Sequence, residues 1–385
     1  MPVEAIASAT GTTTMEITLS KFELLRELAA TQGVVERKTT IPILSNYLFE
    51  AGGDKLTLTA TDLDLSLRTS CSAKVKKEGA CTIPARKLHD YVKLLPDADI
   101  TIKLLENHWV SIRCGRSNTK MVGMAKANFP TLPTFPTAGV LKIPAKVLRA
   151  LIAKTGFAIA SEESRYTLNG ALMVLKPESI TMVATDGHRL AHIEHTGAKF
   201  EGVSGEMKTL VPKKAMDELK SLLDSTDAEE IEFAKDESTL FFRIGQRLLT
   251  SRQLTGQFPN FEAVLPKDNN KSILLHGDEL SAAISRVAQF ADERSRAVRL
   301  RLDKGELKLS ASSTETGESE DSLEIDYNAE PLAIGFNAQY LLDFLKATGS
   351  GDVKLELKDA QSAGQLRPAE GEEYKYRYIV MPMRI

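Results

Sequence analysis

The sequence predicts an α+β fold built from three similar units, each with two helices packed on antiparallel sheets. Two observations predict it. The 385 residues exceed one ordinary core, because a domain usually holds roughly 100 to 200 residues. The same order of helical and extended segments also occurs three times. Asp62, Asp186 and Ser313 occupy corresponding points 124 and 127 residues apart, so one unit spans about 125 residues.

The first unit begins with an amphipathic helix predicted at 19–33, where Phe22 and Leu28 fall on one face. A second helix is predicted at 82–95, with Pro84 suited to its first turn. Runs rich in β-branched and alternating apolar residues predict the strands of this unit. These strands lie at 43–51, 55–62, 64–69, 100–105, 109–114 and 120–124.

The second and third units repeat this order. Helices are predicted at 142–156 and 210–223 in the second unit, and at 277–290 and 337–348 in the third. The predicted strands are 167–176, 180–186, 230–234, 239–244 and 248–253, then 298–302, 306–310, 322–327, 353–357 and 374–381. Many α+β chains can be aligned with themselves in this way, but here element order and spacing agree.

The composition excludes a membrane-spanning helix and argues against a disulfide or zinc framework. No apolar run approaches the roughly 18 residues that a membrane span needs. Cys71, Cys81 and Cys114 are odd in number and lack C-x-x-C spacing, so a reducing cytoplasm fits best. Residues 1–14 are small and polar and predict a disordered tail before Met15, without the features of a secretory signal.

Positive charge gathers in the predicted helices although the whole chain has a formal net charge of −3. The helical segments counted as 20–33, 84–95, 144–156, 212–223, 278–296 and 337–349 hold fifteen Lys or Arg and ten Asp or Glu, so they net +5 and the remainder nets −8. An acidic body with basic helices suits contact with a phosphate backbone without reading of bases. Helix surfaces also favour Lys and Arg in general, so charge alone leaves both interpretations open.

The stretch 180–193 (ITMVATDGHRLAHI) is the most informative hairpin of the sequence. The apolar run predicts a buried strand, Asp186-Gly187 predicts a turn, and 190–193 predicts the returning strand. Three interpretations stay open. Asp186 and His188 could form the centre of a monomeric hydrolase, residues 187–190 could form the floor of a docking groove, or all could be ordinary hairpin residues.

The chemical motifs argue against an enzyme. Neither G-x-x-x-x-G-K-[ST] nor a G-x-G-x-x-G loop between strand and helix occurs. Ser161 and Ser164 lie in no nucleophile elbow, and turn Asp side chains usually bond their own backbone. His188 and His192 are four residues apart in an extended segment, too far for paired metal ligands. The acidic run 315–324 lacks calcium-loop spacing and predicts a solvated loop.

Six short motifs occur in an order that indicates a family. They are TIPIL at 40–44, IPARK at 83–87, RYTLNG at 165–170, ATDGHRLA at 184–191, FP at 258–259 with VLP at 264–266, and VMPMR at 380–384. Each is weak alone, but six in the same order are specific. Over 15–385 the chain resembles the bacterial DNA polymerase III beta subunit, the replication sliding clamp.

The resemblance implies three sliding-clamp domains at 15–135, 141–266 and 272–385, after the tail at 1–14. Two such chains close head to tail into a homodimeric ring around duplex DNA, with helices lining the hole and sheets forming the outer wall. This makes the expected function a processivity factor, non-catalytic and without cofactor or metal. A closed ring cannot leave a duplex sideways, so weak, salt-sensitive phosphate contacts can tether the polymerase while it slides.

The resemblance also implies site residues. The expected DNA contacts are Lys38, Arg86, Glu162, Tyr166 and Thr167, although Glu162 is acidic and Thr167 replaces an aromatic residue of a relative. The expected subunit contact uses Thr119, Met121 and Phe290, where Thr119 again replaces an aromatic residue. Contact with duplex DNA is expected to show no sequence preference.

A groove between domains two and three is expected to take short linear peptides of the polymerase, the clamp loader and repair proteins. Its residues are Leu168, Thr185, Gly187, His188, Arg189, Leu190, Pro259, Val264, Val380, Met381, Pro382, Met383 and Arg384. Ala263 stands where some relatives carry a basic residue. An apolar slot lined by methionine adapts to many ligands, which suits a hub for several partners. No membrane partner is expected.

Overall fold

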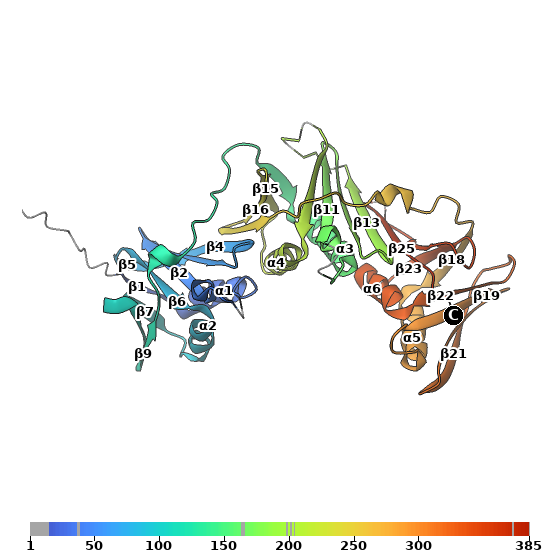
Figure 1. Cartoon of the computed structure of the whole chain (residues 1–385), viewed down its shortest axis with the longest axis horizontal. Coiled ribbons are helices and arrows are strands. Elements are labelled where there is room, and N and C mark those ends of the chain that lie inside the picture. The colour runs from blue at the N-terminus through green and yellow to red at the C-terminus, as the bar shows by residue number, and fades with distance from the viewer. Residues whose placement is uncertain are drawn as a thin grey trace, which may run out of the picture. The chain divides into compact units, whose positions relative to one another are not determined.

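The computed structural model describes residues 15–36, 39–162, 166–197, 199–200, 202–203, 205–371 and 373–384. The predicted tail 1–14 therefore lies outside the described residues. Contacts divide the chain into two compact units, which consist of 1–140 with 221–252 and of 141–220 with 253–385. Figure 1 colours the elements of both units along the chain.

Each of the six α-helices within the described residues directly follows a strand, which gives two strand–helix pairs per predicted domain. The pairs are β1 (Glu16–Ser20) with α1 (Lys21–Thr31), β6 (Gly79–Pro84) with α2 (Ala85–Leu94), β10 (Leu141–Pro144) with α3 (Ala145–Thr155), β14 (Met207–Pro212) with α4 (Lys213–Asp224), β18 (Lys271–His276) with α5 (Gly277–Val287), and β22 (Leu332–Asn337) with α6 (Ala338–Thr348). The predicted threefold repeat of an α+β unit is confirmed.

The predicted starts of three helices are wrong. The helices expected at 82, 142 and 210 each begin three residues later, because the preceding residues end a strand. Pro84 closes β6 as the residue before the helix, not within its first turn. A short apolar run fits a buried strand and a helix equally well, so periodicity could not separate the two.

The first unit contains two antiparallel sheets. One holds β15 (Glu230–Lys235), β16 (Thr239–Ile244), β17 (Arg247–Arg252), β4 (Leu65–Ser72), β3 (Lys55–Thr61), β2 (Asn46–Gly52) and β6 as neighbours in that order. The other has the order β5 (Lys74–Lys77), β1, β7 (Asp99–Leu104), β8 (Trp109–Cys114) and β9 (Ser117–Val122). Pairing of β17 with β4 explains why residues 221–252 belong to this unit.

A buried ion pair fastens β17 to α1. Arg247 Nε donates to Glu27 Oε2 at 3.0 Å, and Thr69 Oγ1 donates to the same oxygen at 2.6 Å. Burial opposes ionisation of Glu27, but hydrogen bonds from Arg247, Thr69 and Arg26 outweigh it and lower its pKa. The carboxylate is therefore charged and paired, as a buried charge must be.

The second unit also contains two antiparallel sheets. The larger has the order β14, β11 (Gly170–Lys176), β12 (Ser179–Thr185), β13 (Arg189–Thr196), β25 (Tyr374–Val380), β24 (Gly364–Pro368), β23 (Asp352–Leu357) and β18. The smaller has the order β21 (Gly317–Glu324), β20 (Glu306–Ser313), β19 (Ala297–Asp303) and β22. Helix α3 packs on β12 and β13, and pairing of β13 with β25 brings distant parts of the chain together.

Two further expectations in this unit are corrected. The acidic run 315–324 is not a loop, because 317–324 form the edge strand β21 paired with β20. The strand expected from 167 begins at Gly170, since Tyr166–Leu168 form a 3₁₀ turn. Across the described ranges, none of the helices combines the length and apolar character of a membrane span.

Candidate functional site: an apolar docking cavity

The turn between β12 and β13 is built by its own side chains. Asp186 Oδ1 accepts the backbone N–H groups of His188 at 2.9 Å and Arg189 at 3.0 Å. Thr185 Oγ1 accepts the N–H of Gly187 at 3.1 Å and donates to the carbonyl of Arg189 at 2.6 Å. Gly187 has a φ of 89°, which glycine adopts without steric cost. The Asp186 carboxylate thus organises backbone rather than a catalytic base.

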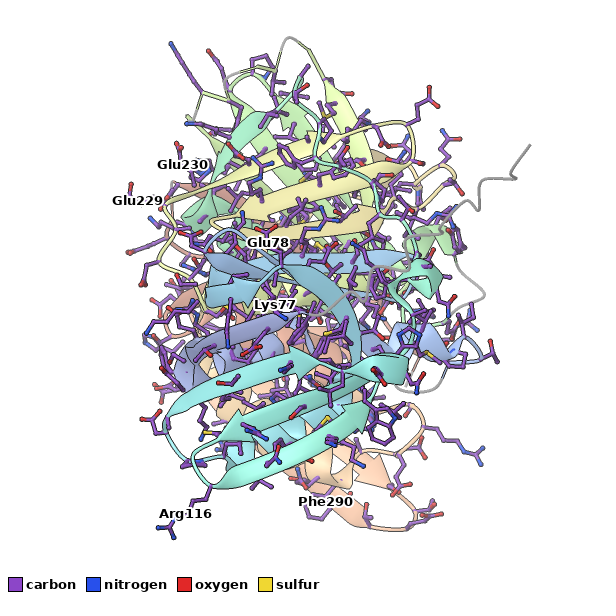
Figure 2. The ribbon with its side chains drawn as sticks, turned by 90° about the vertical axis from the view of Figure 1, so that its left-hand side faces the viewer. Lys77, Glu78, Arg116, Glu229, Glu230 and Phe290 are labelled. Atoms are coloured by element: carbon purple, nitrogen blue, oxygen red, sulfur yellow. The ribbon has the colours of Figure 1, made fainter. Side chains whose placement is uncertain are left out.

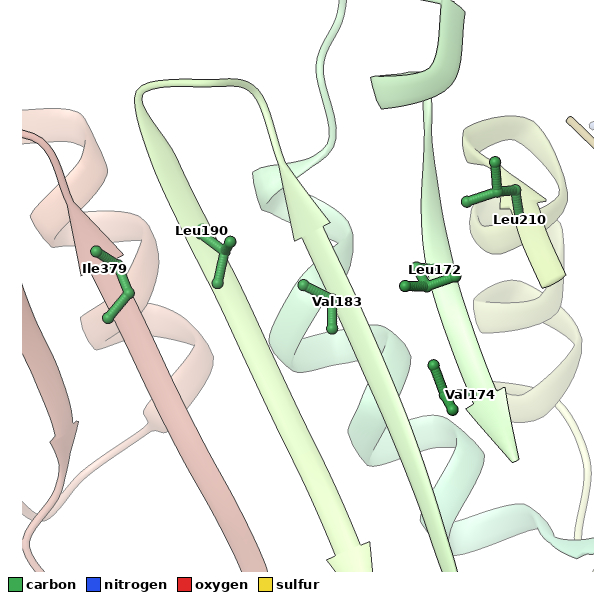
Figure 3. Close-up of a cluster of buried hydrophobic side chains, with 6 residues drawn as sticks. All are labelled: Leu172, Val174, Val183, Leu190, Leu210 and Ile379. Atoms are coloured by element: carbon green, nitrogen blue, oxygen red, sulfur yellow. The ribbon is translucent and has the colours of Figure 1, made fainter. Parts of the chain in front are cut away.

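An apolar row crosses one face of the larger sheet (Figure 3). It consists of Leu172, Val174, Val183, Leu190, Leu210 and Ile379, which come from five neighbouring strands. Partly buried side chains from the segment that follows β17 pack against this row, including Leu254, Phe258, Phe261 and Leu265. The sheet and this connecting segment therefore form the two walls between which a cavity remains.

The cavity opens where the turn, the connecting segment and the end of β25 meet. Eleven described residues line its volume of about 130 Å³, and the surface they present is almost wholly apolar. They are Leu168, Thr185, Gly187, His188, Arg189, Leu190, Pro259, Phe261, Val264, Ile379 and Met381. Nine of them belong to the thirteen groove residues that the family resemblance implied.

Val380, Pro382, Met383 and Arg384 do not line this cavity. Side chains alternate along a strand, so Ile379 and Met381 face the cavity whereas Val380 is fully buried on the other side. The Met383 N–H donates to the Gly335 carbonyl at 2.8 Å, and Arg384 lines a separate cavity beside Arg299 and Glu320. The alternation of 374–381 could have identified Ile379, whereas no sequence signal singled out Phe261.

The terminal segment is fixed to the turn by its backbone. The Met381 N–H donates to the His188 carbonyl at 2.9 Å. The Met381 side chain remains 43% exposed and Val264, across the opening, 44% exposed, so both present apolar surface to solvent. Exposed apolar side chains that rim an apolar cavity are typical of a binding site.

Arg189 ties the turn to two helices. Its guanidinium donates to Asp186 Oδ2 at 3.0 Å, Asp343 Oδ2 at 2.6 Å and the Phe157 carbonyl at 2.7 Å. It also lies 4.3 Å from the centre of the Tyr340 ring. Burial alone would lower the Arg189 pKa, but the nearby Tyr378, Asp343 and Asp186 raise it, so the side chain stays charged. Contacts with Asp343 and Tyr340 of α6 therefore fix the position of Arg189 in the cavity wall.

The residues expected near DNA lie on different parts of the fold. Arg86 is exposed in the first turn of α2, in the first unit. Tyr166, 53% exposed, and half-buried Thr167 belong to the 3₁₀ turn of the second unit, and Glu162 is exposed nearby in the sequence. Lys38 lies outside the described residues.

The residues expected at a subunit contact belong to two sheet edges. Thr119 is half-buried and Met121 buried on β9, the last strand of its sheet. Phe290 is half-buried in the 3₁₀ turn Ala288–Phe290, which contacts the edge strand β21. Both edges end their sheets without a neighbouring strand among the described residues.

Comparison with known proteins places the chain in a family. Models of the N-terminal, central and C-terminal domains of the DNA polymerase III beta subunit match residues 15–133, 142–260 and 262–384. The chain belongs to the DNA polymerase III beta subunit family. Members of this beta sliding clamp family are replication processivity factors and non-catalytic accessory subunits of the polymerase, which removes the hydrolase alternative.

Full-length relatives support the same assignment. The beta sliding clamp of Caulobacter vibrioides is 34% identical over 377 residues, and that of Pseudomonas putida 37% over 374, each covering 96% of this chain and 100% of the relative. The crystal structure of the Pseudomonas aeruginosa subunit has a TM-score of 0.90 at 35% identity, with 96% of this chain and 100% of that chain covered. A Bartonella birtlesii clamp bound to griselimycin has a TM-score of 0.91 at 33% identity, covering 97% and 100%.

Proposed function

We propose that two copies of this chain form a ring that encircles duplex DNA in the cytoplasm, and that the apolar cavity holds short peptides of the replicative polymerase, the clamp loader and repair proteins. The cavity carries this proposal. Its rim offers exposed Met381 and Val264, and its floor offers Leu190 and Ile379. Such a slot accepts apolar peptide anchors, and flexible methionine lets it adapt to several sequences.

The two free sheet edges support a head-to-tail contact because their charges are opposite. Strand β9 and the turn before it carry exposed Lys120 and Arg116. Strand β21 carries exposed Glu318, Glu320 and Glu324. An unpaired edge readily adds a further strand, and opposite charges favour this pairing over the pairing of two identical edges. A contact between unlike edges closes into a ring when the rotation permits.

Weak contact with phosphates is the proposed role of the basic helix surfaces. Arg86, Lys87 and Lys93 are exposed on α2. Such contacts release counterions, so affinity for linear duplex should be low and should fall steeply with added salt. Binding that does not change with salt would contradict this part of the proposal.

Two matched substitutions test the docking cavity. Val264→Glu places a carboxylate at the rim and should weaken binding of a synthetic peptide from the polymerase's clamp-binding segment at least about 30-fold, because an apolar anchor would then meet a charge. Leu274→Glu adds the same charge at a 53% exposed leucine of β18 outside the cavity and should leave affinity unchanged. Peptide affinity is measured by isothermal titration calorimetry. Equal affinities of both variants would exclude the cavity as the peptide-binding site.

A further inference from the structure

One sheet face of the first unit is strongly basic although the chain as a whole is acidic. In the sheet β5-β1-β7-β8-β9, side chains alternate between a buried face and an exposed face. The strands place six cations on the exposed face, Lys74, Lys76, Lys77, Lys103, Arg113 and Lys120, against the two acids Glu16 and Asp99. Arg116 projects from the β8–β9 turn, beyond the end of the strands (Figure 2).

Most of this positive charge is not neutralised within the sheet. Glu16 is shared by Lys76 at 3.0 Å and Lys103 at 3.5 Å. Among the described residues, Lys74, Arg113 and Lys120 have no carboxylate within 4.0 Å. Unpaired cations on a flat, solvent-facing sheet attract a polyanion and release its counterions on binding.

The cations and the single aromatic side chain of this face, Trp109, lie in ordered rows across the strands. Trp109 on β8 stands opposite Val122 on β9, and both are exposed, at 43% and 54%. Ser111 lies two residues after Trp109 on β8, and it stands between Lys103 on β7 and Lys120 on β9. Arg113 lies two residues after Ser111, and it stands between Thr101 on β7 and Asn118 on β9. The rows are about 7 Å apart, because successive residues on one face of a strand are separated by two rises.

We infer that this face, defined by Trp109, Lys103, Arg113 and Lys120, binds single-stranded DNA, with an unpaired base on the indole and phosphates along the cationic rows. Single-strand-binding surfaces combine a basic track with aromatic side chains on which bases stack. A duplex offers no free base face to Trp109, and an acidic peptide would not need the aromatic platform. The inference does not depend on the apolar cavity. Lys120 also lies on the edge strand β9 of the proposed subunit contact, so the mass of each variant is checked by light scattering before its DNA affinity is compared.

Trp109 is the only tryptophan of the chain, so its fluorescence reports on this face alone. Titration of the full chain with a 20-nucleotide oligothymidylate should quench the emission to saturation. The apparent affinity should fall at least about tenfold between 50 mM and 200 mM salt. An abasic oligomer of equal length should quench much less, because the quenching requires a stacked base.

Variants separate this face from general attraction of anions. Lys103→Glu with Arg113→Glu and Lys120→Glu should lower oligothymidylate affinity at least about tenfold. Arg299→Glu with Lys304→Glu and Lys308→Glu makes the same charge change on β19, β20 and the turn between them. This control should leave oligothymidylate affinity within about twofold. Trp109→Leu, followed by anisotropy of a labelled oligomer, should cost about tenfold at unchanged thermal stability.

Three outcomes would overturn the inference. The first is quenching by polyglutamate of equal charge as strong as that by oligothymidylate, since the face would then select charge only. The second is equal quenching by a 20-base-pair duplex. The third is unchanged affinity in the triple variant of the β7–β9 face.

Discussion

Two turns of this molecule share a backbone and differ in what their side chains do. In the β3–β4 turn, Asp62 Oδ1 accepts the N–H groups of Asp64 at 3.0 Å and Leu65 at 2.6 Å. Thr61 Oγ1 accepts the N–H of Leu63 and donates to the Leu65 carbonyl, both at 3.0 Å. Thr185 and Asp186 make the corresponding bonds in the β12–β13 turn. The repeat thus reproduces the turn bond for bond.

The difference begins at the third position. Leu63 adopts a φ of 82°, a left-handed conformation that costs a leucine about 1 to 2 kcal/mol, whereas Gly187 adopts 89° freely. Asp64 and Leu65 then continue the first turn, where His188 and Arg189 continue the second. Only Arg189 reaches a helix carboxylate, Asp343. The comparison teaches that the shared Thr-Asp pair makes the turn and that residues 187–190 make the cavity wall.

Exchanging the variable residues should have the largest effect. Replacing residues 187–190 with those of the first turn, by Gly187→Leu, His188→Asp, Arg189→Leu and Leu190→Ser, keeps Thr185 and Asp186 in place. Polymerase-peptide affinity should fall at least about 100-fold, because the cavity loses its apolar floor and its Arg189 anchor. Fluorescence anisotropy measures the affinity. Circular dichroism should show an unchanged fold, and retained binding would mean that the turn does not form the site.

Removing only the ion pair between Arg189 and Asp343 should have a smaller effect on peptide affinity. Asp343→Asn removes the charge that faces Arg189 at 2.6 Å without touching the cavity lining. Peptide affinity should fall about tenfold, since a charge-assisted hydrogen bond contributes roughly 1.5 to 3 kcal/mol and part of the loss is compensated by Asp186. Asp303→Asn breaks the distant pair with Arg301 at 2.8 Å and serves as the control in the same titration. Equal affinity of both variants would show that α6 does not position Arg189.

Replacing the aspartate of either turn should have the smallest effect, and it should distinguish a loss of stability from a loss of peptide binding. Asp62→Ala and Asp186→Ala each leave two backbone N–H groups without their acceptor, at a cost of about 1 kcal/mol each. Calorimetry should record a small fall of the midpoint temperature for Asp62→Ala and a larger fall for Asp186→Ala, which also loses the 3.0 Å bond from Arg189 Nε. Peptide affinity should fall only for Asp186→Ala. Weakened binding in Asp62→Ala as well would break the distinction between the two turns.

The sequence was sufficient for the repeat and the turn, and the family resemblance named nine of the eleven residues that line the cavity. The Asp186-Gly187 pair and the spacing of the helices depend on local chemistry, which a sequence displays directly. Phe261 was missed because a lone aromatic in a connecting segment has no periodicity. The basic sheet face was missed for another reason. Lys103, Arg113 and Lys120 lie outside the predicted helices and come together only through the order and register of β7, β8 and β9.

Deletion of Met381 to Ile385 is the most direct test of the central proposal, a dimeric clamp with a peptide-docking cavity. Met381 lines the cavity and bonds the turn through its N–H, so its loss should abolish measurable binding of the polymerase peptide. The edges β9 and β21 are untouched, so light scattering should still report twice the 42.2 kDa of one chain. Peptide affinity equal to that of the intact chain would contradict the proposed docking site, and a mass of one chain for the intact protein would contradict the ring.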